Sequence, residues 1–259
     1  MIGLFDSGVG GLTVAKAIMK SLPTYDLVYF GDSARAPYGT KSQQTIQAYI
    51  RENIYFLREK GVKIIIVACN TASSALTEEI LEAAQVPVFE VISPAAQAAA
   101  QISHSRSIGI IGTSGTVKSG VYEKTLKKIA PDARIYSKAC PLLVSLVEEG
   151  WITKPETASI VKKYLLPLKS KQIDTLILGC THYPVLKELI AQKIGKKVNI
   201  IDSSEAVATS VKEYLKTHPE LDAQLAKTSQ SWFYVSDITT QFKKIAQQIL
   251  KIHVKLEQV

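Results

Sequence analysis

The stretch VKIIIVACNT at residues 62–71 decides the fold class of this chain. Its apolar run Ile64–Val67 is unbroken, whereas a strand with one face in water alternates apolar and polar side chains. Unbroken β-branched runs of this length are typical of parallel strands that helices cover on both faces. The run leads into Cys69, Asn70 and Thr71, which places reactive and polar side chains just past the end of the predicted strand.

Other strand-length apolar runs alternate with helix-length segments along the whole chain. The predicted strands are 2–5, 27–30, 62–68, 86–90, 107–111, 133–137, 174–179, 198–201 and 232–235. Strands that alternate with helices predict βαβ units, which build mainly parallel sheets covered by helices. The sequence therefore predicts a doubly wound α/β fold.

The helices between these strands are predicted from apolar periodicity. Segment 41–60 is predicted as a helix because one of its faces carries Ile46, Ile50, Ile54 and Leu57. Thr40 and Gln43 fit a capping box at its start. Segment 117–130 is predicted as one helix with a shared side formed by Val117, Val121, Leu126 and Ile129. A further helix is expected over 238–250.

The chain resembles itself at two places. IGLF at 2–5 and IGII at 108–111 are both followed by Ser/Gly-rich turns. The number of residues between Cys69 and Cys180 is nearly the same as the number between these two motifs. Two pseudo-symmetric α/β domains with a site in the cleft between them explain both intervals. We expect a first domain of residues 1–94 plus 208–259, which carries Cys69, and a second domain of 95–207, which carries Cys180.

Composition excludes several classes of protein. With 46% hydrophobic and 21% charged residues, the 259-residue chain has the profile of a folded globular protein. Its strongest apolar run is too short to span a bilayer, and its N-terminus has no secretory pattern, so we expect a cytoplasmic protein without membrane contact. The net charge of +8 comes from scattered lysines, and nucleic-acid binding is not expected as the main role.

The side chains that could bind a ligand or take part in catalysis follow the ends of predicted strands. Asp6 follows the first strand, Cys69 the third, Thr113 the fifth, and Cys180 with His182 the seventh. Ligands of open α/β sheets bind at the carboxyl ends of the strands, where helix N-termini favour anions. The sequence therefore predicts a site for a carboxylate ligand at these ends.

Nucleotide and metal sites fit the sequence less well. Gly8, Gly10 and Gly11 depart from the spacing of a dinucleotide-binding loop and predict a tight strand-to-helix turn instead. Cys180 and His182 have no second Cys/His pair at zinc-site spacing, so no metal is expected. Cys140 precedes a proline and is predicted to pack in the core.

Two cysteines from two halves of a cleft suit one particular reaction. Inversion of a carbon centre needs one group that removes a proton and another that delivers one to the opposite face. A thiol has an ordinary pKa of about 8.5 and can act as acid or base near neutral pH. A redox pair formed by Cys69 and Cys180 is an alternative, although such pairs normally lie on one turn as C-x-x-C. A binding protein, for nucleic acid among others, is a third class.

Five motifs in order carry a resemblance to a known family. They are DSGVGGLTV at 6–14, GDSARAPYGTKS at 31–42, VACNTAS at 67–73, GTSGTV at 112–117 and LGCTHYP at 178–184. Together they cover nearly the whole chain, which resembles the glutamate racemase family within the cofactor-independent aspartate/glutamate racemases. The chain departs from the family pattern at Ser33, where threonine is usual, and at Leu143 and Ser145, where phenylalanine and proline are more frequent.

The resemblance implies roles for single residues. Cys69 would exchange the α-proton of D-glutamate and Cys180 that of L-glutamate, with Asp6 and His182 assisting the thiols and Glu148 helping on the Cys180 side. The implied substrate-binding residues are Asp6, Ser7, Tyr38, Gly39, Asn70, Thr71, Thr113, Thr181 and His182.

The resemblance also implies partners and a biological role. No cofactor would be needed, the protein would form a homodimer, and D-glutamate would supply peptidoglycan synthesis. Some racemases of this type affect DNA gyrase, which is not expected as the main role here. Aspartate is the alternative substrate.

Overall fold

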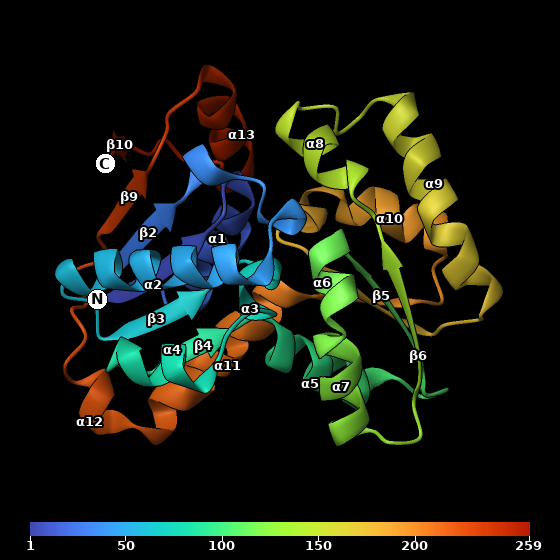
Figure 1. The fold of residues 1–259 in the computed structure, drawn as a ribbon, viewed down its shortest axis with the longest axis horizontal. Helices are drawn as coiled ribbons and strands as arrows, with labels where there is room; N and C mark the ends of the chain where they lie inside the picture. The colour runs from blue at the N-terminus through green and yellow to red at the C-terminus, as the bar shows by residue number, and fades with distance from the viewer.

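Two parallel sheets organise the chain, and the computed structural model describes all of residues 1–259. They form two lobes that lie side by side, and both termini lie in the same lobe (Figure 1). No helix combines the length and the hydropathy that crossing a bilayer requires.

The first sheet has six strands in the order β10-β9-β2-β1-β3-β4. All of its neighbouring strands pair in parallel. The strands are β1 (Ile2–Asp6), β2 (Leu27–Gly31), β3 (Ile64–Val67), β4 (Val88–Glu90), β9 (Ser231–Val235) and β10 (Leu256–Gln258). The C-terminal strands thus return to the sheet that begins the chain.

The second sheet has four parallel strands in the order β6-β5-β7-β8. They are β5 (Ser107–Gly112), β6 (Arg134–Ala139), β7 (Thr175–Gly179) and β8 (Asn199–Asp202). The doubly wound α/β fold with two mainly parallel sheets is confirmed.

The helices of the first lobe are α1 (Leu12–Ser21), α2 (Gln43–Glu59), α3 (Asn70–Ser73), α4 (Glu78–Ala84), α11 (Ser203–Thr217), α12 (Pro219–Asp222) and α13 (Thr240–Leu250). Those of the second lobe are α5 (Ile92–Ile102), α6 (Ser114–Ser119), α7 (Val121–Ile129), α8 (Leu142–Glu148), α9 (Pro155–Ser170) and α10 (Lys187–Ile194). Short 3-10 turns are η1 (Val9–Gly11), η2 (Ser33–Arg35), η3 (Tyr38–Thr40) and η4 (Tyr183–Leu186).

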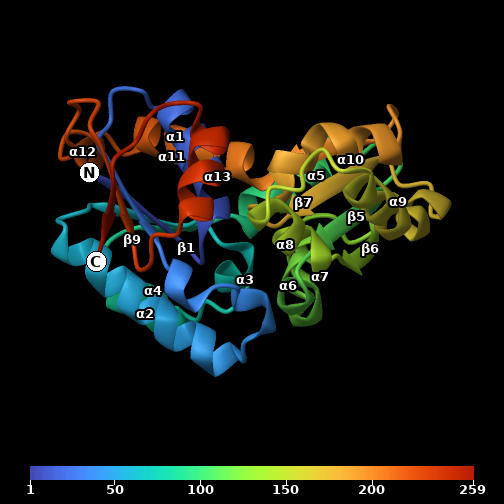
Figure 2. The ribbon, with the colours of Figure 1, turned by 90° about the horizontal axis from the view of Figure 1, so that it is seen from above.

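The unbroken apolar run of β3 serves two cores. Ile64 and Ile66 pack in the core beneath α1, α11 and α13, whereas Ile65 and Val67 pack in the core beneath α2 and α4. Figure 2 shows these two sets of helices on opposite sides of the first sheet. Successive side chains of a strand point to opposite faces, so a doubly covered strand must be apolar at every position.

The helix over 41–60 is confirmed, but its predicted cap is wrong. Ser42 is the cap, and its hydroxyl accepts a hydrogen bond from the Thr45 amide at 3.2 Å. Thr40 lies in η3, where its hydroxyl donates to the Pro37 carbonyl. Ser42 has extended backbone dihedrals and lies three residues before the amide that it caps, which is the geometry of an N-cap.

Segment 117–130 is two helices rather than one. Gly120 adopts a φ of +65° and ends α6 in the left-handed conformation, which favours glycine. The chain restarts as α7, and Leu126 is buried while Ile129 is 45% exposed. The single apolar side predicted across the break is therefore wrong.

Both predicted boundaries between the domains lie within helices. The predicted boundary near 94 lies in the first turn of α5, whose later alanines pack in the second lobe. The boundary at 207/208 lies inside α11, where Val207 and Val211 pack together in a core of the first lobe. Both sheets direct the carboxyl ends of their strands toward the region where the lobes meet.

Candidate active site

A small, largely closed cavity lies where strands of both sheets end. Every site residue predicted from the sequence except Asp6 lines it. Cys69 comes from the first lobe, after β3, and Cys180 comes from the second, after β7. Both side chains are 5% exposed, and all three cysteines of the chain are free thiols. Cys140 packs in the core of the second lobe, as predicted.

Cys69 is the N-cap residue of α3 and lines the cavity. Its thiol donates to the hydroxyl of Ser7 at 3.6 Å. Burial raises the pKa of the Cys69 thiol to about 12, and the nearby Asp6 carboxylate adds to the rise. The sulfur of Cys69 therefore holds its proton at neutral pH.

Cys180 belongs to a chain of three side chains. Its sulfur lies 3.7 Å from Nδ1 of His182, and Nε2 of His182 lies 3.1 Å from Oε1 of Glu148. Burial alone lowers the pKa of His182, but the contacts with Cys180 and Glu148 outweigh burial and hold that pKa well above 6.5. The imidazole is therefore suited to carry a positive charge beside the second thiol.

Asp6 lies beneath the cavity and is fully buried. One carboxylate oxygen accepts from the amides of Gly8 and Gly11, both at 2.9 Å. The other accepts from the hydroxyl of Thr181 at 3.3 Å. Burial raises the pKa of Asp6, and the charge of His182 and these amides offset part of the rise. The role of Asp6 in substrate binding stays a prediction.

The glycines of the η1 turn bring the two lobes into close contact. A Cβ on Gly10 would lie 2.5 Å from Nδ1 of His182 and 2.5 Å from the Thr181 hydroxyl. Three residues later, in the first turn of α1, the hydroxyl of Thr13 lies 2.9 Å from the Gly10 carbonyl and 3.0 Å from that of Thr181. The turn predicted for these glycines is confirmed, and it permits backbone of the first lobe to touch the Cys180 segment.

The rest of the lining offers neutral hydrogen-bonding groups. Thr71 and Thr113 lie on opposite lobes, and their hydroxyls are 2.9 Å apart. Asn70, Ser7 and Thr181 add an amide and two further hydroxyls. No lysine or arginine lines the cavity, so apart from the His182 imidazole the donors available to a carboxylate there are uncharged.

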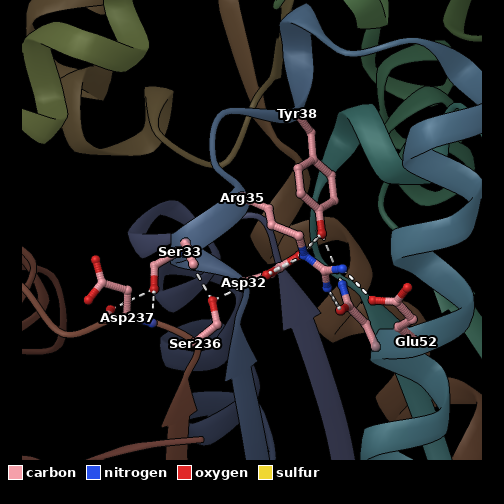
Figure 3. A network of polar contacts seen from close by, with 9 residues as sticks. Asp32, Ser33, Arg35, Tyr38, Glu52, Ser236 and Asp237 are labelled. Carbon is pink, nitrogen blue, oxygen red and sulfur yellow. Dashed lines mark hydrogen bonds and ion pairs between the residues drawn. The ribbon is translucent and has the colours of Figure 1, made fainter.

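Tyr38 and Gly39 line the cavity, and hydrogen bonds to the buried Asp32 hold their loop in place. Figure 3 shows Tyr38 directed toward Asp32, to whose carboxylate the phenol donates a hydrogen bond. Asp32 is fully buried and also accepts from Arg35 at 2.7 Å and from Ser236 at 3.2 Å. Because the Tyr38 hydroxyl is bonded within the protein, the loop presents ring and backbone atoms to the cavity.

Sequence analysis missed part of this site. Pro37 and Val144 line the cavity, and Asp32 anchors the loop behind it. Asp32 and Pro37 belong to the GDSARAPYG string, so that motif was the available signal. Val144 is an apolar residue of α8 without any distinguishing sequence feature.

Comparison with known proteins decides the family. A sequence profile described as Asp/Glu/hydantoin racemase matches residues 12–211. The chain belongs to this racemase family. It is accordingly an isomerase.

Individual glutamate racemases are similar to this chain over most of their length. The chain is 49% identical over 230 residues to a glutamate racemase of Aquifex aeolicus, covering 89% of each chain. A solved glutamate racemase isoform of Bacillus anthracis has a TM-score of 0.93 and 38% identity, with 100% of this chain and 97% of that one covered.

Two further solved structures bear on the site and on the fold. The Francisella tularensis glutamate racemase in complex with D-glutamate has a TM-score of 0.91 and 38% identity, with 100% and 96% of the two chains covered. An aspartate racemase of Picrophilus torridus is similar in fold, at 18% identity and a TM-score of 0.57, with 97% of this chain and 99% of that one covered.

Proposed function

We propose that the protein interconverts L- and D-glutamate by exchanging the α-proton between two thiols. The observation that carries the proposal is the arrival of Cys69 and Cys180 in one cavity from the two lobes. The similarity to glutamate racemases, including one solved with D-glutamate, supports glutamate as the substrate.

In the L-to-D direction, Cys180 acts as the base. Its thiolate, paired with the imidazolium of His182, removes the α-proton and becomes a thiol. Cys69 donates its own proton to the opposite face of the carbanion and becomes a thiolate. The reverse reaction exchanges the two roles. The high pKa of Cys69 supports this assignment, because the free enzyme then holds the proton that Cys69 must deliver.

The other residues set the protonation states of the two thiols or bind the substrate. Glu148 holds the imidazole of His182 and favours its charged form. Asp6, close to Cys69, favours the protonated form of that thiol by charge repulsion. Ser7, Asn70, Thr71, Thr113 and Thr181 supply neutral hydroxyl and amide groups, which can accept hydrogen bonds from the substrate ammonium and donate them to its carboxylates, together with backbone groups of the Tyr38–Gly39 loop.

The product suggests the biological setting. D-glutamate is a building block of peptidoglycan, and we propose that the enzyme supplies it in the cytoplasm as a homodimer. Light scattering of the purified protein tests the dimer, which predicts twice the 28.3 kDa mass of one chain.

A racemisation assay tests the activity. We expect L-glutamate to lose its circular dichroism without added pyridoxal phosphate or metal, and aspartate to react far more slowly. Cys69→Ser and Cys180→Ser should each remove nearly all activity while remaining folded, since a hydroxyl is a much weaker acid than a thiol. If either variant kept most of the activity, the role assigned to that cysteine would be wrong.

A further inference from the structure

Asn70 lines the cavity, and its side-chain amide is fixed at both ends. The phenol of Tyr122 donates to Oδ1 of Asn70 at 2.7 Å. Nδ2 of Asn70 donates to the hydroxyl of Ser203 at 3.4 Å. All three side chains are buried.

The directions of these hydrogen bonds follow from the count of hydrogens. The Ser203 hydroxyl has one hydrogen, which it donates to the carbonyl of Leu178 in β7 at 3.2 Å. Ser203 must therefore accept from Asn70, so the nitrogen of the amide faces Ser203 and the oxygen faces Tyr122. Burial raises the pKa of Tyr122 well above 10, so the phenol keeps the hydrogen that it donates.

This orientation leaves one N–H of Asn70 without a partner in the protein. Nδ2 carries two hydrogens and makes a single hydrogen bond, to Ser203. Asn70 itself lines the same cavity as Cys69 and Cys180. The remaining N–H is thus available to an anionic group bound there, whereas a flipped amide would present an oxygen and repel it.

We propose that Tyr122 is a positioning residue that locks the Asn70 amide as a donor to a substrate carboxylate. The inference rests on the proposed function and extends it to a residue outside the cavity. Tyr122 comes from α7 of the second lobe and Asn70 from α3 of the first, so the lock acts across the cleft. The ring is fitted closely: a Cβ on Gly179, next to Cys180, would lie 3.1 Å from Cε2 of Tyr122.

Removal of the phenol hydroxyl frees the amide to flip. In Tyr122→Phe the ring still packs against Gly179, but Oδ1 of Asn70 loses its donor, and the Ser203 hydroxyl can turn away from Leu178 and donate to Oδ1 of the flipped amide. The apparent dissociation constant of a ligand rises by the inverse of the competent fraction. If the competent orientation falls to between a third and a tenth, the affinity for glutamate drops about 3- to 10-fold.

A double-mutant cycle tests the lock. The dissociation constant of D-glutamate is measured by titration calorimetry for the wild type, Tyr122→Phe, Asn70→Ala and the double variant, and kcat and KM are measured for each. We expect Tyr122→Phe to weaken binding about 3- to 10-fold with kcat changed less than about 2-fold, and to have no further effect in the Asn70→Ala background. Tyr25→Phe, which removes a phenol bonded to Asp222 far from the cavity, is the matched control and should bind like the wild type.

Three outcomes separate this inference from the function on which it rests. An active wild type with unchanged binding in Tyr122→Phe would overturn the lock alone, as would an equal loss in both backgrounds. A wild type that does not racemise glutamate would overturn the proposed function and the lock with it. If Tyr122→Phe does not fold, Tyr122→Met, which also lacks the hydroxyl, takes its place, and weaker binding that depends on Asn70 is again the expected result.

Discussion

Substitution of Gly10 by alanine is the sharpest local test of how the η1 turn supports the site. The new methyl group would lie 2.5 Å from Nδ1 of His182 and from the hydroxyl of Thr181. Carbon atoms in ordinary contact with their neighbours lie about 3.5–4 Å away, so the segment must retreat by roughly 1 Å. Gly8→Ala is a matched control in the same turn, because its Cβ would have no contact closer than 3.7 Å.

The size of the effect follows from the bonds that this retreat strains. The sulfur of Cys180 already lies 3.7 Å from His182, and Glu148 lies 3.1 Å from the other nitrogen of the ring. A displacement of about 1 Å cannot preserve both contacts, and misplacement of catalytic groups on this scale costs about 100-fold in rate. Overpacking of a close-packed interior costs about 1–3 kcal/mol of stability, or roughly 2–4 °C in Tm for each kcal/mol.

Racemisation of L-glutamate and thermal unfolding are the assays for both variants. We expect Gly10→Ala to lose about 99% of kcat/KM with a modest fall in Tm, and Gly8→Ala to remain within about 3-fold of the wild type. The reasoning is refuted if Gly10→Ala keeps more than half of the activity. It is equally refuted if Gly8→Ala loses as much as Gly10→Ala does.

The remaining predictions concern charge and the anchored loop. Alkylation of Cys69 in the free enzyme, followed by peptide mass spectrometry, should accelerate about tenfold per pH unit up to at least pH 10, since its pKa is about 12; a plateau near pH 8.5 would contradict this. Glu148→Gln should lower the pKa of His182 measured by NMR. Because folding raises the pKa of His182, the stability contributed by its charged ring is fully present below about pH 6.5. It is lost as the pH rises through the pKa that His182 has in the folded protein. The loss of Tm caused by Glu148→Gln should therefore be large at pH 6 and shrink at alkaline pH. Asp32→Asn should loosen the Tyr38 loop and raise KM more than it lowers kcat, and an unchanged KM would argue against that anchor.

The parts of the fold that sequence predicted are those with one dominant physical cause. The run Ile64–Val67 is apolar throughout because helices cover both faces of β3, which is the pattern of a buried parallel strand. Cys69 and Cys180 were predicted together because each follows the carboxyl end of a strand, where α/β sheets bind ligands, and the internal repeat places one cysteine in each half. Strand β10 was missed, since Leu256–Gln258 is a short, mostly exposed edge strand without an apolar pattern.

Local competition explains the other errors. Both Thr40 and Ser42 can cap a helix, and only the backbone path through η3 determines which hydroxyl faces a free amide. The predicted helix over 117–130 runs through Gly120, and a single glycine inside a helix costs only about 1 kcal/mol, whereas the tertiary structure uses Gly120 as a left-handed helix end.

The site also contains relations that no one-dimensional pattern encodes. Tyr122 and Asn70 are distant in sequence and come from different lobes, so their hydrogen bond becomes visible only in three dimensions. The same holds for the Ser236 hydroxyl on Asp32, which ties the segment after β9 to the loop of Tyr38. Motifs located the atoms of the cavity lining, while the contacts that orient those atoms required the structure.

Deuterium transfer from solvent tests the two-thiol reaction most directly. L-glutamate is converted by the wild type in deuterated water, the reaction is stopped at low conversion, and the α-carbons of both enantiomers are analysed by NMR. With Cys180 removing the proton and Cys69 delivering another, D-glutamate should carry deuterium while the remaining L-glutamate keeps its original hydrogen. D-glutamate that retains the original hydrogen, or L-glutamate that gains deuterium as fast as product forms, would contradict the exchange between two opposed sulfurs.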